Sequence, residues 1–161
     1  EGREFTIGML GNMRWNVNKP SKNGHGKSFA IPETLRVFPP LEVDLSPVPA
    51  EEAGLYTAVV KSKLYEVPNY LCPAPISKSL RVKMERYAAG AFAAIECCDF
   101  ARVDFRVDQE TGQPLILEIN PLAGLQEGIS DIVMAAQADG VNYIALINGI
   151  VDAARQRYGM I

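Results

Sequence analysis

The sequence has few of the residues on which several common kinds of site depend. Its 161 residues include one histidine and three cysteines. His25 stands in a polar, glycine- and lysine-containing stretch and is expected to be an exposed loop residue, so a histidine-based catalytic triad is not indicated. Cys72, Cys97 and Cys98 are odd in number and lack the spacing of zinc ligands. A reducing, cytoplasmic compartment is therefore favoured over a disulfide framework or a zinc site.

Long apolar runs and an excess of one charge are also missing. No run approaches the ~18 residues that a membrane span needs. The net charge of −3 gives no basic surface for a nucleic acid, so neither a membrane nor a nucleic acid is expected as a partner. What remains is the composition of an ordinary globular domain, with 48% hydrophobic and 22% charged residues.

Periodicity along the chain predicts strands first, then a helix, a hairpin and two further helices. Alternation of apolar residues indicates strands, and apolar residues at helical spacing indicate helices, the first of them capped by Ser77. The order of these elements is typical of the α+β class, with a mainly antiparallel sheet packed against helices. The expected strands are 4–10, 35–38, 41–45, 57–65, 100–107 and 114–120, and the expected helices are 78–96, 130–138 and 142–158.

The hairpin formed by 100–107 and 114–120 carries a pattern of apolar and polar faces. Because side chains alternate between the two faces of a strand, the apolar sides of both strands should face the core together. One face would then carry Val103, Phe105, Val107, Leu115, Leu117 and Ile119. The opposite face would carry Arg102, Asp104, Arg106, Ile116, Glu118 and Asn120.

The polar face of this hairpin has the chemistry of a magnesium and phosphate site. Carboxylates such as Asp104 and Glu118, with the amide oxygen of Asn120, are ligands that Mg²⁺ prefers. Arg102 beside them could hold a phosphate or a developing oxyanion. A solvent-facing hairpin with mixed charges is the alternative. Two neighbouring carboxylates destabilise such a hairpin unless a cation lies between them, which favours the metal site.

Five motifs in order give the chain a resemblance to a known family. They are EGREFT at 1–6, CPAPIS at 72–77, ARVDFRVD at 101–108, LEINPLAGL at 117–125 and a Ser-Asp pair at 130–131. Over nearly its whole length the chain resembles the second half of D-alanine–D-alanine ligases, which belong to the ATP-grasp superfamily. The resemblance implies that 1–161 is an ATP-grasp C-terminal catalytic domain. The first ATP-grasp subdomain and the substrate-binding domain would lie before residue 1, and the chain would be a fragment.

The resemblance also implies roles for individual residues. Asp104, Glu118 and Asn120 fall at magnesium-ligand positions, with Glu118 bridging two ions, and Mn²⁺ is an alternative to Mg²⁺. Arg102 falls where the family places an arginine on the transferring phosphate. Lys61, eleven residues before Cys72, resembles a lysine that contacts ATP phosphates. Lys63 competes for that role, and both lysines could be plain surface residues.

Three further positions match residues around the nucleotide and the substrate. Glu4 matches a carboxylate near the nucleotide ribose, although at the start of a strand it could simply be solvated. Gly124 and Ser130 fall in the loop that receives the substrate carboxylate, where backbone N–H groups and a hydroxyl can stabilise an oxyanion. Ser130 could instead cap the helix that follows it.

The implied activity is an ATP-dependent ligase that joins a carboxylate to an amine through an acyl phosphate. Its partners would be ATP, amino-acid-like small molecules and the remainder of the same polypeptide, with a homodimer as an open assembly state. Gln126 and Glu127 depart from the small polar residues common in this loop, so the substrates stay open. An ATP-grasp ligase for another amino acid or peptide and a non-catalytic nucleotide-binding module are the alternatives. The isolated chain is expected to be inactive.

A second phosphate-binding motif is suggested and rejected. Residues 24–28 read GHGKS, which is similar to the end of a P-loop. The P-loop pattern requires a glycine at position 21, where this sequence has Ser21, and no hydrophobic strand precedes it. The segment is therefore expected to be a surface loop.

Overall fold

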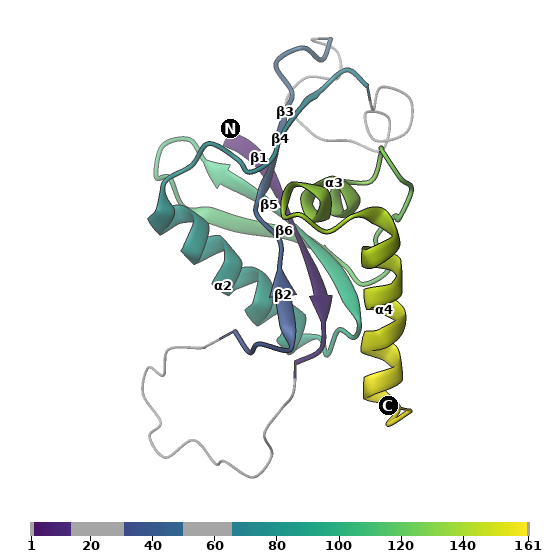
Figure 1. Ribbon diagram of the computed structural model, residues 1–161. Helices are drawn as coiled ribbons and strands as arrows, with labels where there is room; N and C mark the ends of the chain where they lie inside the picture. Colours follow the sequence, from purple (N-terminus) through teal and green to yellow (C-terminus); the bar gives the residue numbers. More distant parts are fainter. Residues whose placement is uncertain (1, 14–30, 50–65, 161) are drawn as a thin grey trace, which may run out of the picture.

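A six-stranded antiparallel sheet forms the centre of the molecule. The structure is a computed structural model and describes residues 2–13, 31–49 and 66–160. The sheet order is β4-β3-β1-β5-β6, and β2 also pairs with β1 (Figure 1). The strands are β1 (Gly2–Gly11), β2 (Leu35–Val37), β3 (Leu41–Asp44), β4 (Asn69–Leu71), β5 (Phe100–Asp108) and β6 (Pro114–Asn120). The predicted α+β class and antiparallel sheet are confirmed.

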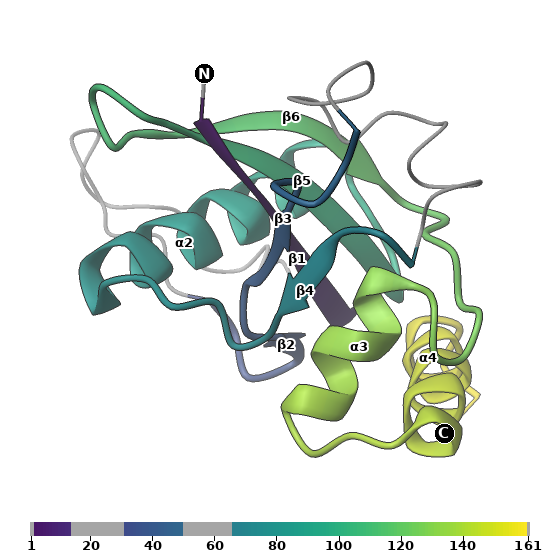
Figure 2. The same cartoon turned by 90° about the horizontal axis from the view of Figure 1, so that it is seen from above.

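Helices cover both faces of the sheet. Helix α2 (Lys78–Ala94) packs on the face that carries Phe5 and Phe105, and the side chains between them form one buried cluster. Helices α3 (Asp131–Ala138) and α4 (Tyr143–Arg157) pack against each other and against the opposite face of β1. Figure 1 shows α2 on one side of the sheet and the α3–α4 pair on the other, and Figure 2 shows the pair lying away from α2.

Helix α2 follows directly from the sequence pattern. The Ser77 hydroxyl accepts a hydrogen bond from the Leu80 N–H at 3.2 Å, which confirms the predicted cap. Met84, Ala88 and Phe92 recur every four residues and are fully buried against the sheet. The helix ends at Ala94, two residues before the predicted end. Glu96 has a φ of 55°, and this left-handed conformation cannot continue a right-handed helix.

A close approach between β1 and α3 depends on Gly8. A Cβ atom at Gly8 would lie 2.6 Å from Cγ1 of Ile132, a buried residue of α3. Replacing Gly8 by alanine is therefore expected to destabilise the fold by about 1–3 kcal/mol, because a packed core must shift. Urea unfolding followed by circular dichroism measures the change.

Gly90 is the matched control for this substitution. It lies inside α2, and a Cβ atom there would meet no atom within 4 Å. Gly90→Ala is expected to stabilise the protein by roughly 0.5–1 kcal/mol, since alanine loses less backbone entropy in a helix. Equal effects of the two substitutions would contradict the tight contact at Gly8.

An ion pair attaches the end of α4 to the start of β5. Asp99 accepts hydrogen bonds from Nε and Nη2 of Arg157, at 3.2 and 2.7 Å, and from Nδ2 of Asn12 at 3.1 Å. The hydrogen bonds from Arg157 hold the pKa of the Asp99 carboxyl below its usual value, and Asn12 adds to the effect. The charged form of Asp99 therefore stabilises the folded state.

The lowered pKa predicts a pH-dependent contribution of Asp99 to stability. This contribution is present above the unfolded pKa of about 3.9 and disappears as the pH falls through the lower folded pKa. Asp99→Asn should cost about 1–2 kcal/mol at pH 7, and asparagine tolerates the φ of 67° at this position. Denaturant unfolding at pH 7, 4 and 2 measures the difference. A difference that stays constant down to pH 2 would argue against this role of Asp99.

A β-bulge divides the hairpin of β5 and β6 into two halves. Asp104 pairs with Glu118 and Phe105 pairs with Ile116, so Leu117 is an extra residue between them. Beyond this point each side chain of β6 changes face relative to a strict alternation. The prediction for this end of β6 is therefore wrong: Leu115 pairs with Arg106 of the polar face, whereas Ile116 pairs with Phe105 of the core face.

Several predictions concern residues outside those that the structure describes. They are the strand 57–65, Lys61, Lys63 and the GHGKS segment with His25. The remaining predicted elements are present, with α3 and α4 ending as expected near Asp139 and Tyr158. Among the described residues, no helix has the length and apolar character required to cross a bilayer.

Candidate metal and phosphate site

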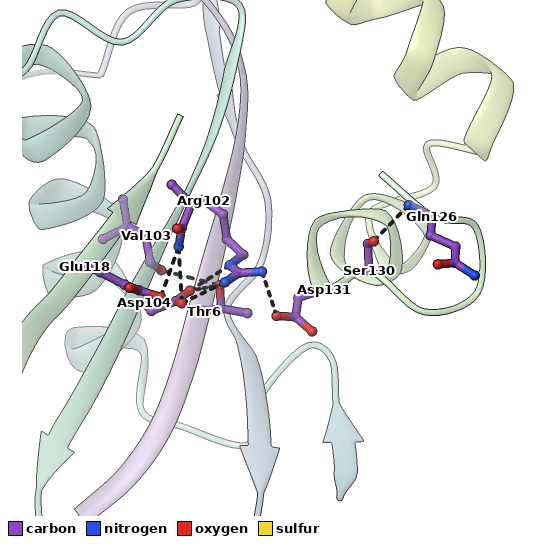
Figure 3. A network of polar contacts seen from close by, with 9 residues as sticks. Thr6, Arg102, Val103, Asp104, Glu118, Gln126, Ser130 and Asp131 are labelled. Carbon is purple, nitrogen blue, oxygen red and sulfur yellow. Dashed lines mark hydrogen bonds and ion pairs between the residues drawn. The ribbon is translucent and has the colours of Figure 1, made fainter. Parts of the chain in front are cut away.

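The predicted carboxylate pair lies on the half of the hairpin that keeps a regular register. Asp104 of β5 stands directly opposite Glu118 of β6, and Arg102 stands opposite Asn120. Nδ2 of Asn120 lies 3.4 Å from an Asp104 oxygen and 3.3 Å from a Glu118 oxygen. Figure 3 shows Arg102, Asp104 and Glu118 gathered together. Strand alternation therefore does bring together the four residues that were predicted to share a site.

Asp104 is also held by β1, through a contact that the sequence did not indicate. Its Oδ1 accepts a hydrogen bond of 2.8 Å from the Thr6 hydroxyl, and Thr6 pairs with Asp104 across β1 and β5. Arg102 donates from Nε and Nη2 to the two Asp104 oxygens at 2.7 and 2.8 Å. With the side chain of Asp104 only 11% exposed, this carboxylate has a fixed orientation. The role of Thr6 was missed because it requires the pairing of β1 with β5.

Arg102 also reaches the first residue of α3. Its Nη1 lies 3.1 Å from Oδ2 of Asp131, so carboxylates lie on two sides of the guanidinium group (Figure 3). Asp131 is a buried charged residue and stands next to Ser130. The sequence contained this Ser-Asp pair, but alternation within the hairpin could not show that α3 packs over Arg102.

Glu4 lies farther along the same face of the sheet. It pairs with Arg106 across β1 and β5, and the two side chains form an ion pair. Glu4 is buried, so the alternative that it is simply a solvated residue at the start of a strand is wrong. A shallow cavity that includes Glu4, Glu42 and Asp44 lies at this edge of the sheet.

Gly124 and Ser130 approach each other in the loop before α3. The Ser130 hydroxyl accepts a hydrogen bond of 2.8 Å from the Gln126 N–H and makes no capping bond to α3, so the capping alternative is wrong. A Cβ atom at Gly124 would lie 3.1 Å from Oγ of Ser130, a tight contact to which the serine side chain would have to adjust. The hydroxyl of Ser130 accepts one bond and keeps its proton to donate.

The donor set fits Mg²⁺. Asp104 and Glu118 offer two carboxylates, with the Asn120 amide between them. Among the described residues, no group of three or more His, Cys, Asp or Glu side chains could hold a metal ion by itself. Mg²⁺ is commonly held by one or two carboxylates together with substrate phosphates. Asn120 directs its NH₂ group at the carboxylates in this structure, and rotation of the amide would present its oxygen instead.

Comparison with solved structures defines the class of fold. The D-alanine–D-alanine ligase from Bacillus anthracis in complex with ATP matches all of this chain, with a TM-score of 0.66 and 17% identity. The ligase from Coxiella burnetii matches 99% of it, with a TM-score of 0.67 and 20% identity. The chain covers 41% and 34% of those two proteins. Its fold is that of one part of these ligases.

Sequence comparison then identifies the family. Residues 38–152 match the model of the D-ala D-ala ligase C-terminus, and the chain belongs to this family. An uncharacterised protein of Sinorhizobium fredii is 35% identical over 98% of this chain. A D-alanine–D-alanine ligase of Ruminiclostridium cellulolyticum is 36% identical over 64% of it. The chain spans 40% and 27% of the lengths of these two relatives.

Proposed function

We propose that this chain is the catalytic C-terminal part of an ATP-dependent carboxylate–amine ligase similar to D-alanine–D-alanine ligases. The reaction would pass through an acyl phosphate that an amine then attacks, releasing phosphate. One observation carries the proposal: Asp104 lies opposite Glu118, with Asn120 between their carboxylates and Arg102 against Asp104. Family membership and the ATP complex of the similar Bacillus anthracis ligase support it.

Asp104, Glu118 and Asn120 are the proposed ligands of the metal, with Glu118 shared between two ions. Bound Mg²⁺ would neutralise the charge of the β- and γ-phosphates during transfer. Thr6 and Arg102 hold the Asp104 carboxylate in place through hydrogen bonds to both of its oxygens. Little reorganisation is then needed when a ligand binds, which is how a fixed polar site lowers a reaction barrier.

The remaining proposed roles follow the position of each residue around this face. Arg102, with Lys61 outside the described residues, would hold the transferring phosphoryl group through charged hydrogen bonds. Ser130 and Gly124 would contact the substrate carboxylate or the tetrahedral oxyanion. Glu4 lies on the same face, two pairing positions from Asp104, and would bind the ribose hydroxyls of ATP.

The proposal includes the rest of the polypeptide. An ATP-grasp site encloses the nucleotide between two subdomains, and this chain matches less than half the length of the relatives named above. The 161-residue chain alone should therefore bind Mg·ATP weakly and release no ADP in the presence of amino acids. Submicromolar affinity of the isolated chain for Mg·ATP, measured by isothermal titration, would contradict the proposal that a second subdomain is needed to complete the site.

ADP release by the complete ligase, measured with a panel of D- and L-amino acids and dipeptides, tests the function. Release that requires both ATP and an amino-acid substrate supports the ligase. No release with any amino acid or dipeptide, despite ATP binding, would favour a nucleotide-binding module. Gln126 and Glu127 lie in the loop beside Ser130, so the panel extends beyond D-alanine.

A further inference from the structure

We propose that Asp131 is a positioning residue, which holds the Arg102 guanidinium group in place when Asp104 also binds the metal. This inference rests on the proposed function and adds a residue to it. It starts from the contacts of Arg102. Nε and Nη2 of Arg102 bind Asp104, whereas Nη1 faces Oδ2 of Asp131 at 3.1 Å. Two carboxylates from different elements thus share one guanidinium group (Figure 3).

The charges explain why Asp104 alone would not hold the Arg102 guanidinium group once a metal binds. Two carboxylates, those of Asp104 and Asp131, contact the guanidinium group of Arg102, and a third, that of Glu118, stands opposite Asp104 across the hairpin. Once a cation binds at Asp104, it withdraws part of that negative charge from Arg102. It also repels the guanidinium group, because both carry positive charge. Asp131 contacts Arg102 through Nη1, whereas Asp104 contacts Nε and Nη2, so Asp131 would still attract the guanidinium group.

The position of Asp131 is fixed by the packing of α3. Its neighbour Ile132 is buried and fills the space above Gly8, where a Cβ atom would not fit. Gly8 pairs with Arg102 across β1 and β5, so the contact that seats α3 lies beside the guanidinium group. Asp131 is the first residue of α3, where the helix dipole favours a negative charge. The carboxylate therefore has a rigid support that is independent of the metal.

Asp131→Asn in the complete ligase removes the charge and nearly preserves the shape. We expect kcat to fall about 10- to 100-fold, with KM for ATP within about two-fold of the wild type, because a misplaced group slows transfer more than binding. Asp139→Asn is the matched control, since Asp139 follows the same helix and pairs with Arg36 away from the site. In an Arg102→Lys background, Asp131→Asn should change kcat less than about two-fold.

A spectroscopic readout tests the same idea without activity. The Nε–Hε signal of Arg102, assigned with Arg102→Lys, is followed by ¹⁵N NMR during titration with Mg²⁺ alone. The signal should stay sharp in the wild type and broaden or vanish in Asp131→Asn, while Asp131→Glu should retain it. Identical titrations of wild type and Asp131→Asn, or equal rate losses from Asp131→Asn in the wild-type and Arg102→Lys backgrounds, would overturn the proposal. Absence of ADP release by the wild type would reject the ligase function, and the titration would still decide the role of Asp131.

Discussion

Asp104→Asn in the complete ligase should lower ADP release by about 1,000-fold or more, the effect expected from removing a proposed ligand of the metal that would neutralise the phosphates. The substitution keeps the size of the side chain. It removes the negative charge opposite Glu118 and replaces one oxygen that accepts from Arg102 by an NH₂ donor. Glu118→Gln should have an effect of the same order. Initial rates of ADP release at saturating Mg·ATP measure both.

Asp108→Asn is the control for loss of a carboxylate from the same strand. Asp108 ends β5 and accepts hydrogen bonds from Thr111 in the turn, so it stabilises the turn and not the polar face. The rate of ADP release by Asp108→Asn should stay within about two-fold of the wild type, as expected for a substitution away from the site. An unchanged rate for Asp104→Asn, or equal losses for Asp104→Asn and Asp108→Asn, would refute the assignment of the metal site.

Phe105→Ala should lower the free energy of unfolding by about 3–5 kcal/mol, the usual cost of removing a buried aromatic side chain. Phe105 is fully buried, pairs with Phe5 across the sheet and packs in the cluster beneath α2. It also follows Asp104 at the bulge, so this loss should loosen the site. Urea unfolding gives the free energy. A thermal scan should show a shift of roughly 10 °C, given about 2–4 °C per kcal/mol at this size.

Leu122→Ala separates this effect from the general removal of an apolar side chain. Leu122 is 88% exposed, in the loop that follows β6. Its substitution should change the free energy of unfolding by no more than about 0.5 kcal/mol. A small loss for Phe105→Ala, similar to that for Leu122→Ala, would mean that the cluster beneath α2 does not carry the stability of the sheet.

The features that were predictable from the sequence depend on short-range periodicity. Spacing of four residues between Met84, Ala88 and Phe92 was enough to find α2, and Ser77 was enough to place its start. Alternation likewise gave β5, β6 and the shared face of Asp104 and Glu118, which the structure shows to be direct partners. These patterns reflect which side of a helix or strand is buried, and that information is contained within one segment.

The features that were missed depend on contacts between distant segments. Thr6 and Asp104 are 98 residues apart, and their hydrogen bond follows only from the register of β1 on β5. The contact of Asp131 with Arg102 requires α3 to lie on Gly8. Leu115 and Ile116 were placed on the wrong faces because the extra residue, Leu117, leaves no mark in a short apolar run. The magnesium, phosphate and substrate roles of the site residues stay predictions.

The bulge at Leu117 has a consequence for how freely the hairpin can be altered. On one side of the bulge, strand alternation fixes the face on which Asp104 and Glu118 lie. On the other side, the alternation of β6 is offset by one residue. Three outer pairs, Phe105–Ile116, Arg106–Leu115 and Val107–Pro114, separate the loop at 109–113 from Asp104 and Glu118. The tip of the hairpin is thus a natural place to insert an epitope or a fluorescent label without disturbing Asp104 and Glu118, which lie toward the other end of the two strands.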